Sequence, residues 1–133
     1  MNTEPSQQSD SIESASSLER ACLCAKTCED FKGKDIVVLD VAKITPLFDY
    51  FIIATATNQR QSNAIAEEIR VLMKRESTRR RNIEGKDSEW ILGDYGDIVL
   101  HIFTEEAREL YDLERLWADA KKVDWQSFRT DSH

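Results

Sequence analysis

Two segments of the chain are apolar at almost every position. Residues 35–41 read D-I-V-V-L-D-V, and residues 50–56 read Y-F-I-I-A-T-A. Strands that are buried on both faces have this continuous apolar character, whereas half-exposed strands alternate apolar with polar residues. The two segments are therefore predicted as strands in the interior of a sheet.

Two other segments carry apolar residues at helical spacing. The first is predicted as a helix from about residue 17 to 30, with Ser16 as its N-cap and Glu19 completing a capping box. The second runs from about 58 to 75, where Asn58 is the expected N-cap and Gln61 its reciprocal partner. Its apolar stripe comprises Ile65, Ile69, Leu72 and Met73.

The most informative stretch is Glu89 to Phe103, which reads E-W-I-L-G-D-Y-G-D-I-V-L-H-I-F. Two short runs rich in β-branched and aromatic residues flank the turn Asp94-Tyr95-Gly96-Asp97. Glycine and aspartate are favoured in turns. The stretch is therefore predicted as an antiparallel hairpin of two strands, 90–92 and 98–103.

A last helix is predicted after this hairpin. Thr104 is its expected N-cap, and a break is expected near Asp112. Its apolar stripe would comprise Leu110, Leu113, Leu116, Trp117 and Ala120. The order of the elements predicts an α+β fold, a mixed β-sheet of about four to five strands with helices packed on it. The helix at 58–75 is long enough to be a crossover between parallel strands.

Length and composition indicate one domain with polar ends. The chain has 133 residues, of which 41% are hydrophobic and 32% charged, as is typical of globular proteins. Residues 1–15 offer little to bury, so a disordered, acidic and serine-rich tail is predicted there. A single domain is predicted for residues 16–120. Residues 121–133 are predicted as a C-terminal tail, in which Val123, Trp125 and Phe128 could dock.

The formal net charge of −7 argues against a generic nucleic-acid binder, because phosphate contacts need clustered lysines and arginines. One local basic cluster is present, at Arg79, Arg80 and Arg81. It can contact ribosomal RNA, or it can be a solvated helix end and loop. There is no run of about 18 apolar residues and no basic, apolar leader, so we expect a cytoplasmic protein that does not contact a membrane.

The sequence offers little catalytic or metal-binding chemistry. Cys22, Cys24 and Cys28 lack C-x-x-C spacing and a fourth ligand, so we interpret them as small apolar helix residues. No glycine-rich phosphate loop occurs. His101 lies in an apolar strand without a nucleophile or acid placed to work with it. We therefore predict no cofactor and no metal, and a core or interface histidine at position 101.

Asp94 and Asp97 flank the hairpin turn and are the remaining candidates for chemistry. Paired carboxylates can hold magnesium, so a nucleotidyltransferase-like enzyme is an alternative function. That class needs two acids alternating along one strand, and no Asp-x-Asp or Asp-x-Glu lies within a predicted strand. Aspartate is also a standard turn residue, which favours a structural role.

Aromatic side chains gather in the C-terminal third of the chain. Trp90, Tyr95, Tyr111 and Trp117 lie there together with Arg115. Aromatic residues and arginine are favoured anchors of protein interfaces, but tryptophan is also common in cores. The pattern alone leaves a binding face and a plain core equally open.

Three blocks of the sequence carry a family resemblance. Residues 49–61 read D-Y-F-I-I-A-T-A-T-N-Q-R-Q, the second block comprises Glu84-Gly85 and residues 90–103, and residues 111–120 read Y-D-L-E-R-L-W-A-D-A. The chain thereby resembles the ribosomal silencing factor family, RsfS, also called the Iojap-like family. Ala56 and Asn58 depart from the family's usual glycine and serine. Asparagine still caps well, so the helix after it is expected to survive.

The resemblance implies an interaction protein and not an enzyme. Family members bind the large ribosomal subunit through ribosomal protein L-fourteen and block its association with the small subunit, which represses translation when nutrients are scarce. The resemblance also implies a nucleotidyltransferase fold without its catalytic acids, and a homodimer, which some members form. Carried over by position, the partner-binding residues are Trp90, Leu92, Asp94, Tyr95, Asp97, Tyr111, Glu114, Arg115 and Trp117.

These expectations divide the hairpin into two ends. The turn Asp94-Tyr95-Gly96-Asp97 is expected to present groups to the partner. The strand that follows, with His101 inside it, is expected to serve the core. The division predicts exposed side chains in the turn and buried side chains in the strand.

Overall fold

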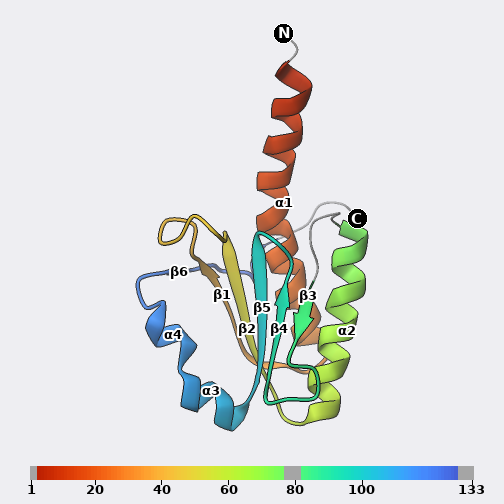
Figure 1. Ribbon diagram of the computed structural model, residues 1–133, viewed down its shortest axis with the longest axis vertical. Coiled ribbons are helices and arrows are strands. Elements are labelled where there is room, and N and C mark those ends of the chain that lie inside the picture. Colours follow the sequence, from red (N-terminus) through yellow and green to blue (C-terminus); the bar gives the residue numbers. More distant parts are fainter. Residues whose placement is uncertain (1–2, 77–81, 129–133) are drawn as a thin grey trace.

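The computed structural model describes residues 3–76 and 82–128, and within them the side chains from Ser17 onward. Figure 1 shows a sheet with helices packed on it. The elements in chain order are α1 (Thr3–Asp30), β1 (Lys34–Asp40), β2 (Tyr50–Ala56), α2 (Gln59–Glu76), β3 (Asn82–Glu84), β4 (Trp90–Asp94), β5 (Ile98–Thr104), α3 (Glu105–Tyr111), α4 (Leu113–Leu116) and β6 (Lys121–Lys122).

The described residues form one mixed sheet of six strands in the order β3-β4-β5-β2-β1-β6. β2 and β5 are parallel, and the other neighbouring pairs in this part of the chain are antiparallel. The predicted α+β class, the parallel crossover and the antiparallel hairpin of β4 and β5 are therefore confirmed. The predicted number of four to five strands is wrong.

The two strands that the sequence did not reveal lie at the two edges of the sheet. β3 has three residues and β6 has two, Lys121 and Lys122. β3 alternates over only three residues, Asn82-Ile83-Glu84, and β6 consists of two lysines, so both fall short of the four or more residues over which a strand pattern is recognised. Short, charged edge strands protect a sheet against pairing with other chains, which is why edges often lack a hydrophobic signal.

The two faces of the sheet are covered by different helices. α1 and α2 run alongside the strands and cover one face (Figure 1), where the core includes Ile52, Ile65, Ile69, Leu100 and Ile102. The much shorter α3 and α4 cover the other face, where the core includes Leu39, Phe51, Ile53, Val99 and Phe103. Successive residues of β5 alternate between these two cores, because side chains of a strand point to opposite faces.

α1 is longer than the sequence suggested. A disordered tail was predicted for residues 1–15 and a helix start at Ser16, but α1 begins at Thr3, so Ser16 lies inside the helix and is not its N-cap. The added segment contains no glycine, and Pro5 falls in the first turn, where proline is tolerated. Backbone propensity therefore permits a helix that hydrophobic periodicity does not indicate.

The three cysteines confirm their interpretation as small apolar helix residues. Cys22, Cys24 and Cys28 are free thiols, fully buried in the core beneath α1. Burial raises the pKa of Cys22 to about 11 and that of Cys28 to about 12. Thiolate, and not thiol, is the reactive form, so these side chains serve packing.

α2 begins as the sequence predicted. Asn58 accepts a hydrogen bond at its Oδ1 from the backbone N–H of Gln61 at 2.8 Å, which confirms the N-cap. Gln61 reaches back to the backbone N–H of Thr57 at 2.7 Å rather than to that of Asn58. The departure from serine at position 58 therefore leaves the helix intact.

Residues 121–128, part of the predicted C-terminal tail, lie against the sheet and the helices. β6 pairs with β1. Trp125 is buried, and its indole Nε1 donates to the carbonyl oxygen of Ile36 at 3.3 Å. Val123 and Phe128 pack against the same core, as predicted. In the part of the chain that the structure describes, no helix has the length and apolar character needed to cross a membrane.

Candidate functional site

The last two helices meet at a sharp break. Thr104 caps α3, with its Oγ1 accepting from the N–H of Ala107 at 3.2 Å. α3 ends at Tyr111, and Asp112 adopts the left-handed conformation with φ 46° and ψ 50°. Aspartate is one of the few residues other than glycine that visit this region. The predicted cap and the predicted break are both confirmed.

The break changes which apolar side chains of these helices are buried. Leu113 is 9% exposed, whereas Leu110 is 73% and Leu116 is 77% exposed. The prediction that Leu110 and Leu116 continue a buried stripe is therefore wrong, because a left-handed residue between them ends the helical periodicity. The sequence indicated a helix break at Asp112, but it did not indicate which leucines the break leaves exposed.

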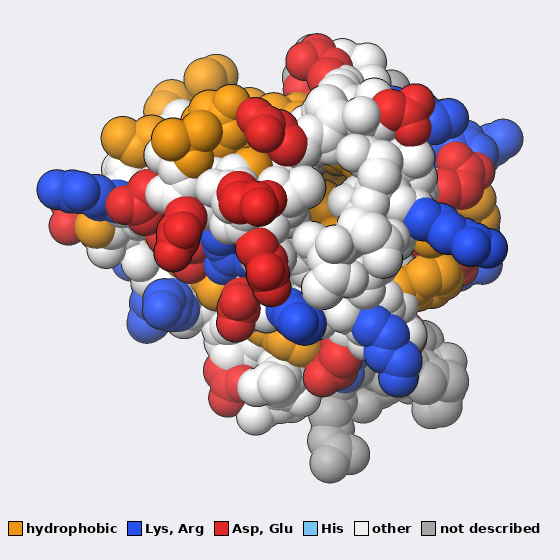
Figure 2. All heavy atoms as spheres, turned by 90° about the horizontal axis from the view of Figure 1, so that it is seen from below, with side chains coloured by type: hydrophobic (Ala, Val, Ile, Leu, Met, Phe, Trp, Pro, Cys, Tyr) orange, Lys and Arg blue, Asp and Glu red, His pale blue; other side chains and the backbone are white. Residues whose placement is uncertain are grey.

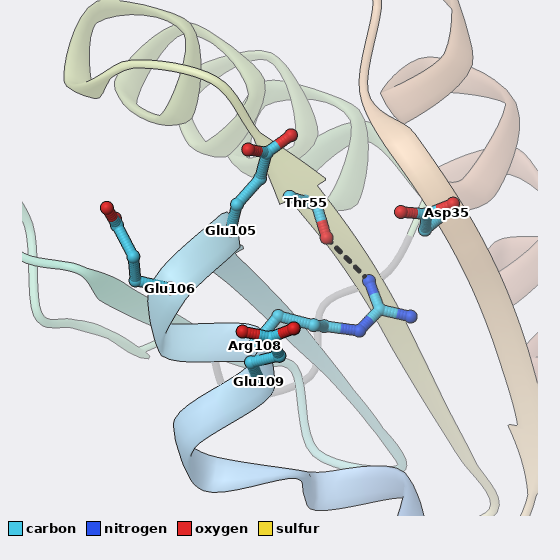
Figure 3. Close-up of a pocket in the computed structure, with 6 residues that line it drawn as sticks. All are labelled: Asp35, Thr55, Glu105, Glu106, Arg108 and Glu109. Atoms are coloured by element: carbon cyan, nitrogen blue, oxygen red, sulfur yellow. Dashed lines mark hydrogen bonds between the residues drawn. The ribbon is translucent and has the colours of Figure 1, made fainter.

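Arg108 fixes α3 against the sheet and against α4. Figure 3 shows its guanidinium reaching Thr55 of β2, to whose Oγ1 the Nη1 group donates at 2.8 Å. Its Nε donates to Glu114 Oε1 at 2.9 Å. Hydrogen bonds of a charged donor are stronger than neutral ones. One half-buried arginine thus joins a central strand to both short helices.

A row of aromatic rings connects α3 to α4 across the sheet. The ring centroids of Tyr111 and Trp90 are 4.9 Å apart, and those of Trp90 and His101 are 5.9 Å apart. The row continues from His101 to Phe51 at 5.1 Å and from Phe51 to Trp117 at 4.8 Å. Trp90 and Trp117 are half-buried, so each has one side in the core and one in solvent. Such residues suit interfaces.

We call this surface the α3–α4 face. It brings together half-buried and exposed aromatic and leucine side chains on the side of the sheet that the short helices only partly cover. Its members are Trp90, Leu92, Leu110, Tyr111, Leu116 and Trp117. Four of them, at positions 90, 92, 111 and 117, were predicted as partner-binding residues, whereas Leu110 and Leu116 were not.

His101 is buried beneath the α3–α4 face and contacts Trp90, one of its members. It is buried, and its Nδ1 accepts from the indole Nε1 of Trp90 at 3.2 Å. Burial lowers the pKa of His101 from 6.5 to about 4, so the ring is neutral near pH 7. The predicted core or interface position is confirmed. A neutral imidazole is required here, because a protonated Nδ1 could not accept the bond that orients Trp90.

The hairpin turn does not present its groups as predicted. Tyr95 is 2% exposed and belongs to the core beneath α1 and α2, on the opposite side of the sheet from the α3–α4 face. Asp97 is bound by Arg20 of α1, whose Nη1 and Nη2 donate to its two carboxylate oxygens at 3.0 and 2.6 Å. Neither residue joins the other predicted partner-binding residues. The buried strand that follows the turn agrees with its prediction.

The same contacts bear on the alternative of a magnesium enzyme. The carboxylate of Asp97 is engaged on both oxygens by a guanidinium, and Asp94 accepts at Oδ1 from the N–H of Gly96 at 3.0 Å. These are structural roles that aspartates commonly fill at turns. Within the described residues, no group of three or more histidine, cysteine or acidic side chains is arranged to hold a metal ion. The geometry therefore does not favour the alternative.

Acidic side chains border the α3–α4 face. Glu105, Glu106 and Glu109 of α3 line a cavity of about 410 Å³ together with Asp35, Thr55 and Arg108 (Figure 3). Figure 2 shows acidic side chains grouped in the left half of the view, next to a hydrophobic area. An apolar surface with an acidic border is complementary to a protein that carries apolar and basic side chains.

The remaining predicted partner-binding residues differ in their contacts and in their exposure to solvent. Glu114 is tied to Arg108 and positions α4, whereas Arg115 is exposed beside Leu116. Asp94 is partly exposed at the end of β4. The basic cluster Arg79-Arg80-Arg81, predicted as a possible contact to ribosomal RNA, lies outside the described residues.

Comparison with known families finds a match over most of the chain. Residues 14–133 match the family described as "Ribosomal silencing factor during starvation". The chain is 41% identical over 100 residues to the ribosomal silencing factor RsfS of Chromobacterium violaceum, which covers 74% of this chain and 82% of that protein. It is 37% identical over 103 residues to RsfS of Bacillus subtilis, covering 77% and 87% of the two chains.

Plant and structural relatives are also found. The chain is 36% identical over 110 residues to the chloroplastic protein Iojap of Arabidopsis thaliana, covering 83% of this chain and 46% of that one. A crystal structure of a Chromobacterium violaceum protein aligns with a TM-score of 0.71 and 36% identity, covering 86% of this chain and 95% of the other. A Bacillus halodurans structure aligns with a TM-score of 0.66 at 28% identity, covering 81% and 97%.

Proposed function

Because the chain belongs to the ribosomal silencing factor family, RsfS, we propose that its α3–α4 face binds the large ribosomal subunit through ribosomal protein L-fourteen. The bound protein would occupy the surface that the small subunit needs. It would thereby block association of the subunits and repress translation under nutrient limitation, in the cytoplasm. The proposal needs no reaction centre and no cofactor.

The observation that carries the proposal is the pair of exposed leucines beside half-buried aromatic rings. Leu110 immediately precedes Tyr111, whose ring lies against that of Trp90, and Leu116 immediately precedes Trp117. Interfaces draw most of their binding free energy from a few large side chains that lose water on docking. The α3–α4 face offers such anchors at both ends of the aromatic row.

Charge supports a protein partner for this face. The border supplied by Glu105, Glu106, Glu109 and Asp35 is acidic, and phosphate groups would be repelled by it. Basic side chains of a ribosomal protein would be attracted instead, which raises the rate of encounter and helps to fix orientation. The first contact proposed is therefore to protein and not to RNA.

A steric block also needs a rigid body, and the contacts of the described residues supply one. Arg108 joins α3 and α4 to β2, and Arg20 joins α1 to the turn between β4 and β5. Rigid anchors lose little side-chain freedom on binding, which favours affinity. The nucleotidyltransferase-like fold and the homodimer implied by the family resemblance stay predictions of this proposal.

A binding measurement with one matched control tests the proposed face. Leu116→Ser removes an anchor of the α3–α4 face that is 77% exposed, and Leu47→Ser removes a leucine of similar exposure, 72%, on the β1–β2 loop. We expect Leu116→Ser to weaken co-sedimentation with purified large subunits at least tenfold and Leu47→Ser to leave it near the parental value. Equal effects of the two changes would place the contact elsewhere.

A subunit-joining assay tests the function itself. Purified large and small subunits are mixed at increasing concentrations of the protein, and the fraction of joined ribosomes is read from a sucrose gradient. Joining should fall as the protein saturates the large subunit, and Leu116→Ser should shift the curve to higher concentration. Unimpaired joining at saturating protein would contradict the silencing function while leaving binding intact.

A further inference from the structure

The segment that follows α4 runs along the outer side of β1, and we call residues 118–128 the strap. Its strand β6 pairs with the last residues of β1. After β6, the backbone N–H of Val123 donates to the carbonyl oxygen of Val38 at 2.8 Å. The indole Nε1 of Trp125 then donates to the carbonyl oxygen of Ile36 at 3.3 Å. The strap is therefore bonded to β1 from the end of that strand back towards its beginning.

The two ends of the strap belong to different cores. Ala120, like Trp117 just before the strap, packs against the core on the side of α3 and α4. Trp125 is 7% exposed and belongs to the core beneath α1 and α2. Further on, the carbonyl oxygen of Phe128 accepts from Lys26 Nζ of α1 at 2.9 Å. Figure 1 shows this blue end of the chain leaving α4 and passing the edge of the sheet as β6. The strap thus ties α4 to α1 around the edge of the sheet.

α4 depends on such outside contacts for its position. It has four residues, and helices shorter than about 12 residues are marginal on their own in water. Asp112, which precedes it, gives it no side-chain cap among the described residues. On the N-terminal side, Arg108 holds Glu114 through a bond of 2.9 Å. On the C-terminal side, Trp117 leads directly into the strap. The direction in which Leu116 points is therefore set by attachments at both ends of α4.

Trp125 is the main apolar attachment of the strap. It is the one buried side chain of residues 118–128, all of which the structure describes, whereas Val123 and Phe128 are only partly buried. Lys121 and Lys122 are exposed and add backbone pairing without apolar contact. A buried tryptophan removes a large apolar area from water, and here its N–H also has an acceptor. Removing this ring should therefore loosen the strap more than any other side-chain change within it.

We propose that Trp125 is a positioning residue for the α3–α4 face. It anchors the strap beneath α1 and thereby fixes α4, so that Leu116 and Trp117 are held ready for the partner. It acts through the strap from the opposite side of the sheet and does not itself touch the partner. The proposal rests on the proposed function for its consequence in binding, but the coupling of Trp125 to α4 is a property of the protein alone.

Hydrogen exchange of the full chain, followed by mass spectrometry, measures this coupling. In Trp125→Ala the amides of residues 113–120 should exchange about fivefold faster or more, because local opening of α4 becomes easier. Met73→Ala is the matched control, since it truncates a fully buried side chain of the same core on α2 and leaves the strap unchanged. It should leave exchange at 113–120 near the parental rate. Unchanged exchange in Trp125→Ala, or an equal increase in Met73→Ala, overturns the proposal.

The same variants are compared in co-sedimentation with purified large subunits. Trp125→Ala should weaken binding about fivefold or more, whereas Met73→Ala should bind with nearly the parental affinity. Trp125→Phe keeps an aromatic ring in the core and loses only the bond to Ile36, so it should recover most of the affinity. Thermal unfolding shows that each variant is folded and how much stability it has lost. Equal binding losses in Trp125→Ala and Met73→Ala would show a general effect of core stability and overturn the proposal.

A second pair of variants tests the strap without emptying the core of a large ring. Val123→Pro removes the N–H that donates to Val38, whereas Val123→Ala keeps that N–H and only shortens the side chain. Val123→Pro should speed exchange at residues 113–120 and weaken binding, and Val123→Ala should change both much less. Equal effects of the two changes would contradict a role for the pairing of the strap with β1 in holding α4.

The two readouts keep this proposal separate from the proposed function. If the parental protein does not bind large subunits, the proposed function fails, and the exchange measurements still decide whether Trp125 holds α4. If the parental protein binds and Trp125→Ala binds equally well in spite of faster exchange at 113–120, the positioning role is overturned and the proposed function stands. Faster exchange together with weaker binding, both reversed in Trp125→Phe, is the result expected from the structure.

Discussion

The same strands supply both faces of the sheet, but helices cover only one face completely. We call that face the closed face and the other the open face. α1 and α2, of 28 and 18 residues, cover the first, and their buried side chains reach 0% exposure at Ile65, Ile69 and Met73. α3 and α4, of 7 and 4 residues, cover the second and leave Leu110 and Leu116 in solvent. Long helices can bury a whole face, whereas two short helices joined by a left-handed residue cannot.

The difference teaches where stability and binding reside. The closed face includes the ion pair of Arg20 and Asp97, which joins segments 77 residues apart and is almost fully buried. The open face includes aromatic rings that are only half-covered. Changes on the closed face should therefore alter the free energy of unfolding, and changes on the open face should alter association. The predictions below are arranged from the largest expected effect to the smallest.

Arg20→Ala should have the largest effect. It leaves the carboxylate of Asp97 buried without its guanidinium, which costs about 3–5 kcal/mol of unfolding free energy. Arg70→Ala breaks an exposed pair with Glu67 and should cost less than about 1 kcal/mol. Urea denaturation followed by far-UV circular dichroism measures both. A loss of similar size in the two variants would contradict the contrast between buried and exposed pairs.

Acid should destabilise the protein through His101. Its pKa is about 4 in the folded state against 6.5 in the unfolded state, so the unfolded chain binds more protons between these values. The contribution of the neutral ring is complete above about pH 6.5 and is lost as the pH falls towards 4, by up to about 3 kcal/mol in total. Denaturation at several pH values should show this slope, and His101→Gln should reduce it. Identical slopes in the two proteins would contradict the assignment.

Arg108→Ala should have an intermediate effect. It removes the bonds to Thr55 and Glu114, and about 1–3 kcal/mol of unfolding free energy should be lost with them. Because α3 and α4 lose their common anchor, binding to large subunits should weaken as well. Lys34→Ala, which breaks the exposed 3.8 Å pair with Glu105, is the control and should change neither measurement.

Leu116→Ser should change stability least. The side chain is 77% exposed, so the free energy of unfolding should stay within about 0.5 kcal/mol of the parental value. Leu113→Ala, a buried change on the same short helix, should cost about 2 kcal/mol or more. Thermal unfolding compares them. A marked destabilisation by Leu116→Ser would mean that the leucine supports the fold and is not available to a partner.

The sequence predicted the elements that have strong local signals. Continuous apolar runs gave β1 and β2, Asn58 gave the start of α2, and Asp112 gave the break after α3. Each of these depends on residues close together in the chain. Element type and capping are therefore accessible from spacing and residue chemistry.

Features that depend on distant residues were not accessible in this way. Tyr95 was expected in solvent because it lies in a turn, yet its ring reaches the core under α1 and α2. Asp97 was expected to face a partner, yet Arg20 binds it from 77 residues away. No local pattern encodes such a pairing. Leu110 and Leu116 were missed for a related reason, since a break was predicted but not the direction that the chain takes after it.

The parallel pairing of β2 with β5 also sets an order of events when the chain folds. Residue Tyr50 lies opposite Ile98, so the centre of the sheet closes only after a loop of nearly fifty residues has been brought together. Closing such loops costs entropy before any contact repays it. On a translating ribosome, α1 and β2 would emerge long before Asp97, which binds Arg20 of α1, and Ile98, which pairs with Tyr50 of β2. The protein proposed here to restrain ribosomes would itself depend on a nearly complete round of synthesis before its core can form.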